Sequence, residues 1–434
     1  MHTIKGTAQI IDDTRIQGWF FDERKISRPL SFELYVNGKK VSDLSASVQR
    51  DDLVTANIHP TGDVGLLYKY DIDTLDDVRL KCKEEEFEFV VQEGFASDGE
   101  FAKKELCIVH IGMHKTGSTS IQQALSSLTD ETFSYFNLHA QNHSIPIYSL
   151  FVPKPEHYHI HSRAGKSKEQ VKAYNRSVKE LFAKHLSENP HCSTFLLSGE
   201  DISVLPKPSL LTFRSFLLRF FKKIEIVAYV RSPASYMSSS FQERVKGGAY
   251  TFDFENDYPH YRNRFEKFDT VFGKENVQLI HFDPKKMKNS DVVCDFLLRI
   301  GLDADCVISH RANESLSLQA TAIFYLANKR LLSKKPVSEN EKGRIKLLNF
   351  LLQKIGDRFL LRQSLIDTVL QKNKSDIKWI EKRMAVSVAE KPLGVSMGIG
   401  CEEDLFETAK KALRDMDPSQ YDELNEILDV NLLE

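Results

Sequence analysis

The chain has 434 residues, which exceeds one typical domain, so two or three modules are expected. Its hydrophobic content of 41% and charged content of 28% are ordinary for a soluble globular protein. The net charge of −2 argues against a surface built broadly for nucleic acid, although a local basic cleft is compatible with that total.

The six cysteines are scattered, without a CxxC pair or a zinc spacing, which favours free thiols in a reducing compartment. We find no signal-peptide core at the N-terminus and no run of about 18 apolar residues. We therefore expect a cytoplasmic protein without a membrane span.

Residues 1–92 are predicted to form a small all-β module, a sandwich or barrel, because short apolar runs and turn signals recur about every ten residues. One run alternates apolar and polar residues up to Val36, and Asn37 and Gly38 then supply a tight hairpin turn. The polar stretch 93–105 is predicted to be a linker.

Residues 106–310 are predicted to form a P-loop-like α/β core with an open parallel sheet, because short apolar runs alternate there with amphipathic segments. The predicted strands are LCIVHI, STFLLSG, IEIVAYV and VQLIHF. Residues 311–434 carry apolar residues at spacings of three and four, so this C-terminal region is predicted to be mostly helical.

A loop with two glycines joins a buried-looking strand to a helix within residues 107–125. Backbone N–H groups and the helix dipole at such a junction favour an anion. Gly112 and Gly117 have the P-loop spacing, but Ser118 stands where a nucleotide-binding P-loop has its lysine, and the cation is Lys115 instead. This order argues against a site for a nucleoside triphosphate with Mg²⁺. Four residues add hydroxyl donors: Thr116, Ser118, Thr119 and Ser120.

The loop HIGMHKTGSTSIQ resembles the 5′-phosphosulfate loop of the PAPS-dependent sulfotransferases, most closely in the bacterial branch that acts in polysaccharide and capsule sulfation. The resemblance implies a P-loop-like fold, PAPS as the co-substrate, PAP as the product and no essential metal. A transferring sulfuryl group carries less negative charge than a phosphoryl group, so a lysine and aimed N–H dipoles can replace part of the role of Mg²⁺. Lys115 would stabilise the transferring group, and the 5′-phosphate would be held by Lys115, Thr116, Gly117, Ser118, Thr119 and Ser120.

A second anion site is required by the 3′-phosphate of that donor. The stretch IEIVAYVRSPASYMSSSF places Arg231 at the C-terminal edge of a strand, where open α/β sheets bind ligands. Pro233 suits the first turn of a helix, and Ser239 lies about two turns further on. The 3′-phosphate motif of the family is similar, so Arg231 and Ser239 are expected to hold this phosphate. The resemblance covers about residues 106–317.

Several residues are candidates for the general base that accepts the proton of the acceptor hydroxyl. Glu200 follows the strand STFLLSG, and several carbohydrate sulfotransferases resemble this chain in having a glutamate there. The alternative is that Asp201 or Ser203 caps a helix and Glu200 only lies near its N-terminus. A histidine of EHYHIHSR is the rival base: the alternating histidines would share one face if extended, and a metal site is the less favoured interpretation. These are His157, His159 and His161.

Three further interpretations stay open. Arg311 and Asn313 either close over the donor or start a helix, with Asn313 as its cap. The aromatic residues of the β module either stack on sugar rings or form its core. They are Trp19, Phe20, Phe21, Tyr35, Tyr68 and Tyr70. The C-terminal helices either cover the acceptor site or form a surface for oligomers.

The sequence thus predicts a sulfotransferase that moves the sulfuryl group of PAPS to a hydroxyl of a carbohydrate acceptor, with Lys115 and Glu200 as catalytic residues. No nucleic-acid partner is expected. One alternative is a P-loop kinase-like phosphotransferase that needs ATP and Mg²⁺. The other is a non-catalytic glycan-binding or assembly protein with a transferase-like fold.

Overall fold

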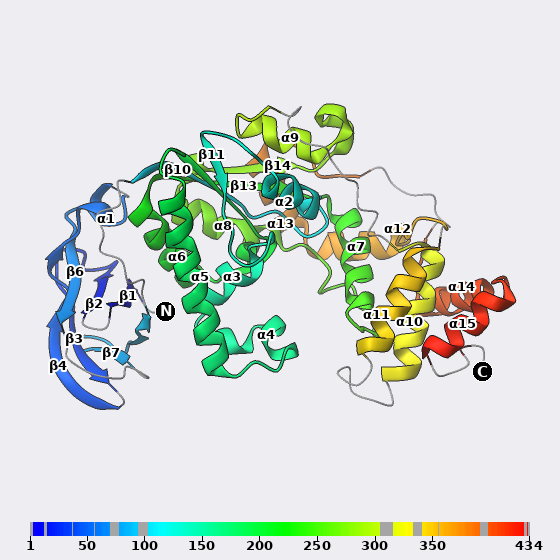
Figure 1. The fold of residues 1–434 in the computed structure, drawn as a ribbon, viewed down its shortest axis with the longest axis horizontal. Helices are drawn as coiled ribbons and strands as arrows, with labels where there is room; N and C mark the ends of the chain where they lie inside the picture. Colours follow the sequence, from blue (N-terminus) through cyan, green and yellow to red (C-terminus); the bar gives the residue numbers. More distant parts are fainter. Residues whose placement is uncertain are drawn as a thin grey trace.

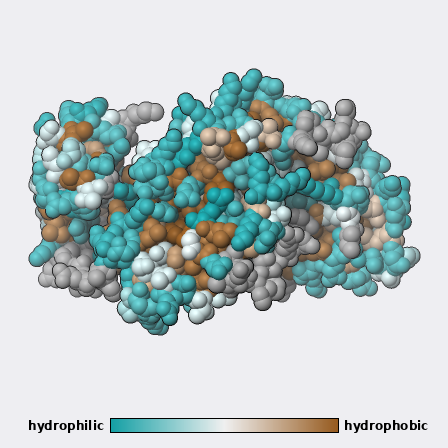
Figure 2. Space-filling view, turned by 90° about the horizontal axis from the view of Figure 1, so that it is seen from above, coloured by the Kyte–Doolittle hydropathy of each residue, from teal (hydrophilic) through white to brown (hydrophobic). Residues whose placement is uncertain are grey.

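The computed structural model describes the chain except residues 1–2, 13–14, 37, 56, 70–77, 94–102, 304–315, 333–340, 355, 391–397, 429–431 and 433–434. An all-β module, a central α/β body and a group of C-terminal helices follow one another along the long axis of the molecule (Figure 1). Seen from above in Figure 2, the outer parts are mostly hydrophilic, and apolar residues gather toward the middle of that face.

The N-terminal module consists of two sheets that share one apolar core. The first sheet has the order β5-β6-β2-β1-β9 and the second β4-β3-β7-β8. The strands of the first are β1 (Ile4–Asp12), β2 (Arg15–Asp22), β5 (Val48–Gln49), β6 (Asp63–Lys69) and β9 (Gln92–Glu93). Those of the second are β3 (Ser31–Val36), β4 (Lys39–Ser45), β7 (Val78–Cys82) and β8 (Glu88–Val90). The predicted hairpin is confirmed, since β3 pairs antiparallel with β4 around Gly38, whose φ of 78° is left-handed.

The aromatic residues of β2 belong to the interior of this module. Phe20 lies in the core between the two sheets, and Trp19 and Phe21 pack on the opposite face of β2 with Leu53 of the short helix α1 (Asp51–Thr55). All three rings are at most 4% exposed, so the core interpretation holds for these three and none of them offers an open face to a sugar, whereas Tyr35 and Tyr68 are half-buried. Tyr70 lies outside the described residues.

The central body is built on a five-stranded parallel sheet with the order β11-β12-β10-β13-β14. Its strands are β10 (Lys104–His110), β11 (Phe133–Tyr135), β12 (Thr194–Ser198), β13 (Phe221–Val230) and β14 (Val277–His281). The four predicted strands are confirmed, and the short edge strand β11 was not predicted. Strand β10 already begins at Lys104, inside the stretch predicted to be a linker.

Helices cover both faces of this sheet, which is why its strands are continuous apolar runs. Ile108 faces α2 and α9 in one cluster, whereas Val109 faces α5, α6 and α8 in the other. The helices of this body are α2 (Ser118–Ser126), α3 (Ser144–Phe151), α4 (His159–Arg163), α5 (Lys168–Glu188), α6 (Lys207–Phe220), α7 (Pro233–Lys246), α8 (Tyr261–Phe272) and α9 (Val292–Arg299). Short 3₁₀ turns are η1 (Pro155–His157), η2 (Glu200–Val204), η3 (Lys274–Asn276), η4 (Pro284–Lys286) and η5 (Lys288–Ser290).

The C-terminal region is helical, as predicted. Its helices are α10 (Leu318–Leu332), α11 (Glu341–Leu352), α12 (Gln363–Lys372), α13 (Lys374–Met384), α14 (Glu402–Arg414) and α15 (Pro418–Leu428). Helix α10 packs against α7, and α13 packs against α8, so this region shares the apolar core of the sheet. Among the described residues, no helix is long and apolar enough to cross a membrane.

Candidate active site

The loop between β10 and α2 has an unusual backbone. Lys115 has φ 65° and Gly117 has φ 79°, so two of its residues adopt the left-handed conformation that non-glycine residues rarely take. Gly117 is the N-cap of α2 and provides no side-chain cap, which leaves the first N–H groups of the helix without the usual capping oxygen. A free helix N-terminus of this kind binds anions through its N–H groups and its dipole.

Gly112 is required by close packing on the other side of the loop. A Cβ atom at this position would lie 2.8 Å from His110 Nε2 and 2.9 Å from Ser118 Oγ. Both of these polar atoms are buried and have no hydrogen-bond partner among the described residues. Buried polar atoms without partners are costly, so a ligand or a water that pairs with Ser118 would be stabilised here.

The hydroxyls of the loop do not all face outward. Thr116 is fully buried, and its Oγ1 donates to the Met113 carbonyl at 2.7 Å, so this side chain stabilises the loop itself. Its part in anion binding is therefore limited to its backbone N–H. Thr119 and Ser120 are half-buried on the first turn of α2.

Arg231 lies against the same loop. It follows β13, the neighbour of β10 in the sheet, and its Nη1 donates to the Lys115 carbonyl at 2.8 Å, while Nε donates to Ser235 Oγ at 3.2 Å. Burial, with a smaller contribution from Arg358, lowers the pKa of Arg231 to about 10. Arg231 thus remains a cation at neutral pH, although it is half-buried. The two predicted anion-binding cations lie on one edge of one sheet.

Helix α7 connects these two cations. Pro233 is in its first turn, as predicted. Ser239 is 7% exposed and makes no side-chain hydrogen bond among the described residues. One turn further on, Glu243 Oε1 lies 2.8 Å from Lys115 Nζ. Because residues four apart share a helix face, Ser239 lies on the face of α7 that is turned toward the loop.

Glu200 is positioned at the end of β12, the other neighbour of β10. Its Oε2 accepts three hydrogen bonds from side chains, whereas no hydrogen bond to Oε1 is found among the described residues. The donors are Asn142 Nδ2 at 3.0 Å, Gln122 Nε2 at 3.3 Å and Ser144 Oγ at 3.3 Å. One oxygen of the carboxylate is thus held in place by three donors.

The capping alternative for this segment is wrong. Residues Glu200–Val204 form a short 3₁₀ turn whose N-cap is Gly199, without a side-chain cap. Ser203 Oγ donates to the Glu200 carbonyl at 2.6 Å, and Asp201 accepts from the Tyr158 hydroxyl. Asp201 Oδ1 also lies 3.6 Å from Nε2 of His114 in the loop, so the end of β12 and the loop are in contact.

A polar network below the loop was missed by the sequence analysis. His110, the last residue of β10, is 1% exposed, and its Nδ1 lies 2.8 Å from Ser198 Oγ, which also accepts from Gln122 at 3.3 Å. Burial lowers the pKa of His110 to about 4, against a smaller opposing effect of Glu200, so the ring is neutral at pH 7. The signal in the sequence was a histidine that ends an otherwise apolar strand.

The three histidines after α3 do not share a face, because the segment is not extended. They lie on η1 and α4 instead of an extended strand. His161 is buried with its Nε2 2.9 Å from Ser149 Oγ, whereas His157 and His159 are exposed. Within the part of the chain that the structure describes, no three His, Cys, Asp or Glu side chains could hold a metal ion. Arg311 and Asn313 lie outside the described residues.

These features define a parallel α/β domain with a P-loop-like loop, which contains Lys115, at the carboxyl edge of its sheet. No family model matches the chain. A segment of 163 residues, 36% of this chain, is 26% identical to an uncharacterized protein of Archaeoglobus fulgidus, and the match spans 43% of the length of that protein.

Two solved structures are also similar to this chain. One is a sulfotransferase from Alicyclobacillus acidocaldarius, with 16% identity, a TM-score of 0.34, and coverage of 55% of this chain and 99% of that one. The other is the sulfotransferase domain from the curacin biosynthetic pathway, with 12% identity, a TM-score of 0.31, and coverage of 66% and 99%.

Proposed function

We propose that this protein transfers the sulfuryl group of PAPS to a hydroxyl of a saccharide. The observation that carries the proposal is the contact between the two cationic anchors: the guanidinium of Arg231 donates to the backbone carbonyl of Lys115 at 2.8 Å. A single nucleotide with phosphates at both ends of its ribose can therefore reach both. The order of residues in the loop, with lysine before the second glycine, matches this donor better than a nucleoside triphosphate.

Each residue has a distinct part in the proposed reaction. The backbone N–H groups at the start of α2 and the Ser118 hydroxyl hold the 5′-phosphate. Arg231 and Ser239 hold the 3′-phosphate. Lys115 stabilises the charge that develops on the transferring group and on the bridging oxygen as the bond between sulfur and that oxygen breaks. The acceptor oxygen attacks sulfur, its proton passes to Oε1 of Glu200, and PAP leaves.

Calorimetry tests the donor class. We expect PAP to bind with a dissociation constant in the micromolar range without added metal, and ATP with Mg²⁺ to bind far more weakly. Tight binding of ATP that depends on Mg²⁺, together with no binding of PAP, would assign the protein to the phosphotransferases. Absence of binding by both nucleotides would favour a non-catalytic protein.

The ion pair between Lys115 and Glu243 leads to a second prediction. The Glu243 carboxylate lies between Lys115 and Lys246, at 2.8 Å and 2.9 Å, and these cations outweigh the effect of burial, so its pKa is lower than usual. Glu243 thus competes with an anionic ligand for Lys115 and repels that ligand. We expect Glu243→Gln to tighten PAP binding on the order of tenfold at low salt, with a smaller gain at high salt.

Calorimetry at two salt concentrations measures this effect. Glu266→Gln is the matched control, since Glu266 is an exposed glutamate that pairs with Arg262 on α8. Unchanged or weaker PAP binding in Glu243→Gln would mean that this carboxylate does not oppose the donor.

A further inference from the structure

A row of buried polar side chains lies below the loop and ends at Glu200. His110, Ser198 and Gln122 are each at most 3% exposed, and hydrogen bonds connect them one to the next. A buried polar group lowers stability unless it is paired, and an apolar side chain would fill the same space without that penalty. The proposed reaction uses none of these three side chains, so their presence needs a separate explanation.

Gln122 joins the base to the helix that follows the loop. It lies on α2 four residues after Ser118, the first residue of that helix, so both side chains are on one face. The amide nitrogen of Gln122 carries two hydrogens, and it lies 3.3 Å from Glu200 Oε2 and 3.3 Å from Ser198 Oγ. The helix whose N-terminus would hold the 5′-phosphate therefore also holds the carboxylate of Glu200.

His110 joins the same row to the backbone of the loop. Its Nδ1 lies 2.8 Å from Ser198 Oγ. The other side of the ring packs against Gly112, where a Cβ atom would lie 2.8 Å from Nε2 and 3.0 Å from Cε1. The ring thus fills the space between the loop and Ser198. A shift of the backbone at Gly112 would displace the ring, because a packed interior leaves little room for independent movement.

We propose that Gln122 and His110 are positioning residues, which set the orientation of the Glu200 carboxylate from the helix and the loop that hold the donor. Neither residue contacts the reacting atoms. The inference rests on the proposed sulfotransferase function for the role of Glu200 as base, but the connection within the row is measured without it. The loop, helix α2 and the base then act as one unit, so damage to the row lowers turnover and spares donor binding.

Gln122→Met tests this division between turnover and binding. Methionine has nearly the length of glutamine but no N–H groups, so it removes both hydrogen bonds with little change of shape. We expect kcat for sulfuryl transfer from PAPS to fall on the order of tenfold, the usual effect of a lost hydrogen bond to a charged group. KM for PAPS and the dissociation constant of PAP should stay within about twofold of the parent.

A double-mutant cycle with Glu200→Gln separates positioning from a general loss of structure. If Gln122 acts through the carboxylate, Gln122→Met lowers the rate of the parent but adds no further loss to Glu200→Gln. An equal fractional loss in both backgrounds would mean that Gln122 only stabilises the fold. His110→Asn, whose amide can pair with Ser198 in place of Nδ1, should retain more of the rate than His110→Leu.

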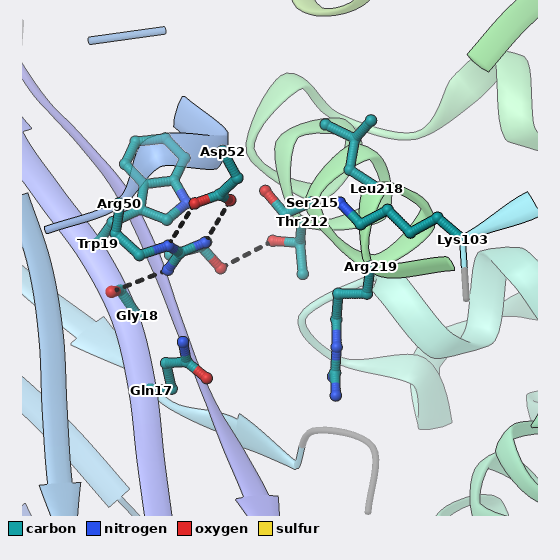
Figure 3. A pocket seen from close by; sticks show the side chains of 11 residues that line it. Gln17, Gly18, Trp19, Arg50, Asp52, Lys103, Thr212, Ser215, Leu218 and Arg219 are labelled. Carbon is teal, nitrogen blue, oxygen red and sulfur yellow. Dashed lines mark hydrogen bonds and ion pairs between the residues drawn. The ribbon is translucent and has the colours of Figure 1, made fainter. Parts of the chain in front are cut away.

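Thr212→Val is the control for the loss of a polar contact elsewhere in the fold. Figure 3 shows Thr212 on α6, opposite Arg50 and Asp52 of the β module. Its Oγ1 lies 3.1 Å from Thr7 Oγ1, so this variant removes a hydrogen bond between the β module and the α/β body. We expect it to transfer the sulfuryl group at the rate of the parent. Thermal unfolding of each variant checks that it is folded.

A spectroscopic measurement tests the row without turnover. Histidine labelled with ¹³C at Cε1 gives one signal for each of the 14 histidines, and the signal missing from His110→Asn is that of His110. Because burial lowers the pKa of His110 to about 4, its signal at pH 7 reports the surroundings of the ring. We expect Gln122→Met to shift this signal in the absence of nucleotide, and PAP to shift it in the parent.

Three results would overturn the inference: transfer by Gln122→Met at the rate of the parent, an equal loss in both backgrounds of the cycle, or a His110 signal that is the same in Gln122→Met and in the parent. A parent that binds no PAP and transfers no sulfuryl group would refute the proposed function instead. The connection within the row would then stand or fall with the His110 signal of Gln122→Met alone.

Discussion

Replacing Arg231 by alanine is expected to weaken PAP binding by a factor on the order of 100 to 1000, because two charge-assisted hydrogen bonds to a phosphate are lost. The guanidinium is half-buried and stays charged, so its hydrogen bonds to a phosphate are screened less by water than those of an exposed arginine. Calorimetry with PAP measures the loss directly. The salt dependence of the remaining affinity should also decrease, since one cation no longer contributes.

Arg231→Lys separates charge from geometry. Lysine keeps the charge but not the planar fork, so we expect an affinity between those of the parent and Arg231→Ala. Arg262→Ala, which removes an exposed arginine paired with Glu266, is the matched control and should bind PAP normally. Thermal unfolding checks that loss of the contact with the Lys115 carbonyl has not unfolded the loop. Normal PAP binding by a folded Arg231→Ala protein would refute the two-anchor site.

Replacing Glu200 by glutamine is expected to lower the rate of sulfuryl transfer by about 100- to 10,000-fold, the usual range for a general base. Glutamine has the same shape and keeps one oxygen for the donors Gln122, Asn142 and Ser144. PAP affinity should therefore stay within about twofold of the parent. Transfer of labelled sulfate from PAPS to a saccharide, with PAP binding measured in parallel, tests both statements.

Two neighbours serve as comparisons for Glu200. Asp201→Asn changes an adjacent carboxylate that is engaged by Tyr158 and near His114, and we expect a much smaller loss of rate. His159→Ala removes an exposed histidine of the rival segment. Undiminished transfer by Glu200→Gln, together with a loss in His159→Ala, would move the role of base to that segment.

Elements with a strong local pattern were predictable from the sequence. The four long strands are apolar runs because helices cover both faces of the sheet, and the amphipathic helix α5 has its own capping box at Ser167. Strand β11 has three half-buried residues at the sheet edge, too few to form a pattern. The pattern of the histidine segment was also too short to be decisive. Alternation over five residues fits a strand, but the contact of His161 with Ser149 favours a helix there.

The residues of the candidate site were predictable only where a sequence motif lies within one continuous segment of the chain. The loop with Lys115 and the strand end with Arg231 are such segments. The hydrogen bonds that hold Glu200 were not predictable, since their three donors lie on α2, two residues before α3, and at the start of α3, and these segments meet only in the folded chain. The same holds for the pairing of Lys115 with Glu243 on α7.

The central place of β10 in its sheet has a consequence for biosynthesis. Both partners of this strand, β12 and β13, come later in the chain, with Leu106 opposite Thr194 and Lys223. A nascent chain that stops before β13 therefore has the whole anion loop but lacks the strand that supports one side of it. Such non-local pairing folds slowly, so the capacity to bind a nucleotide should emerge late in translation, after residue 230 has left the ribosome.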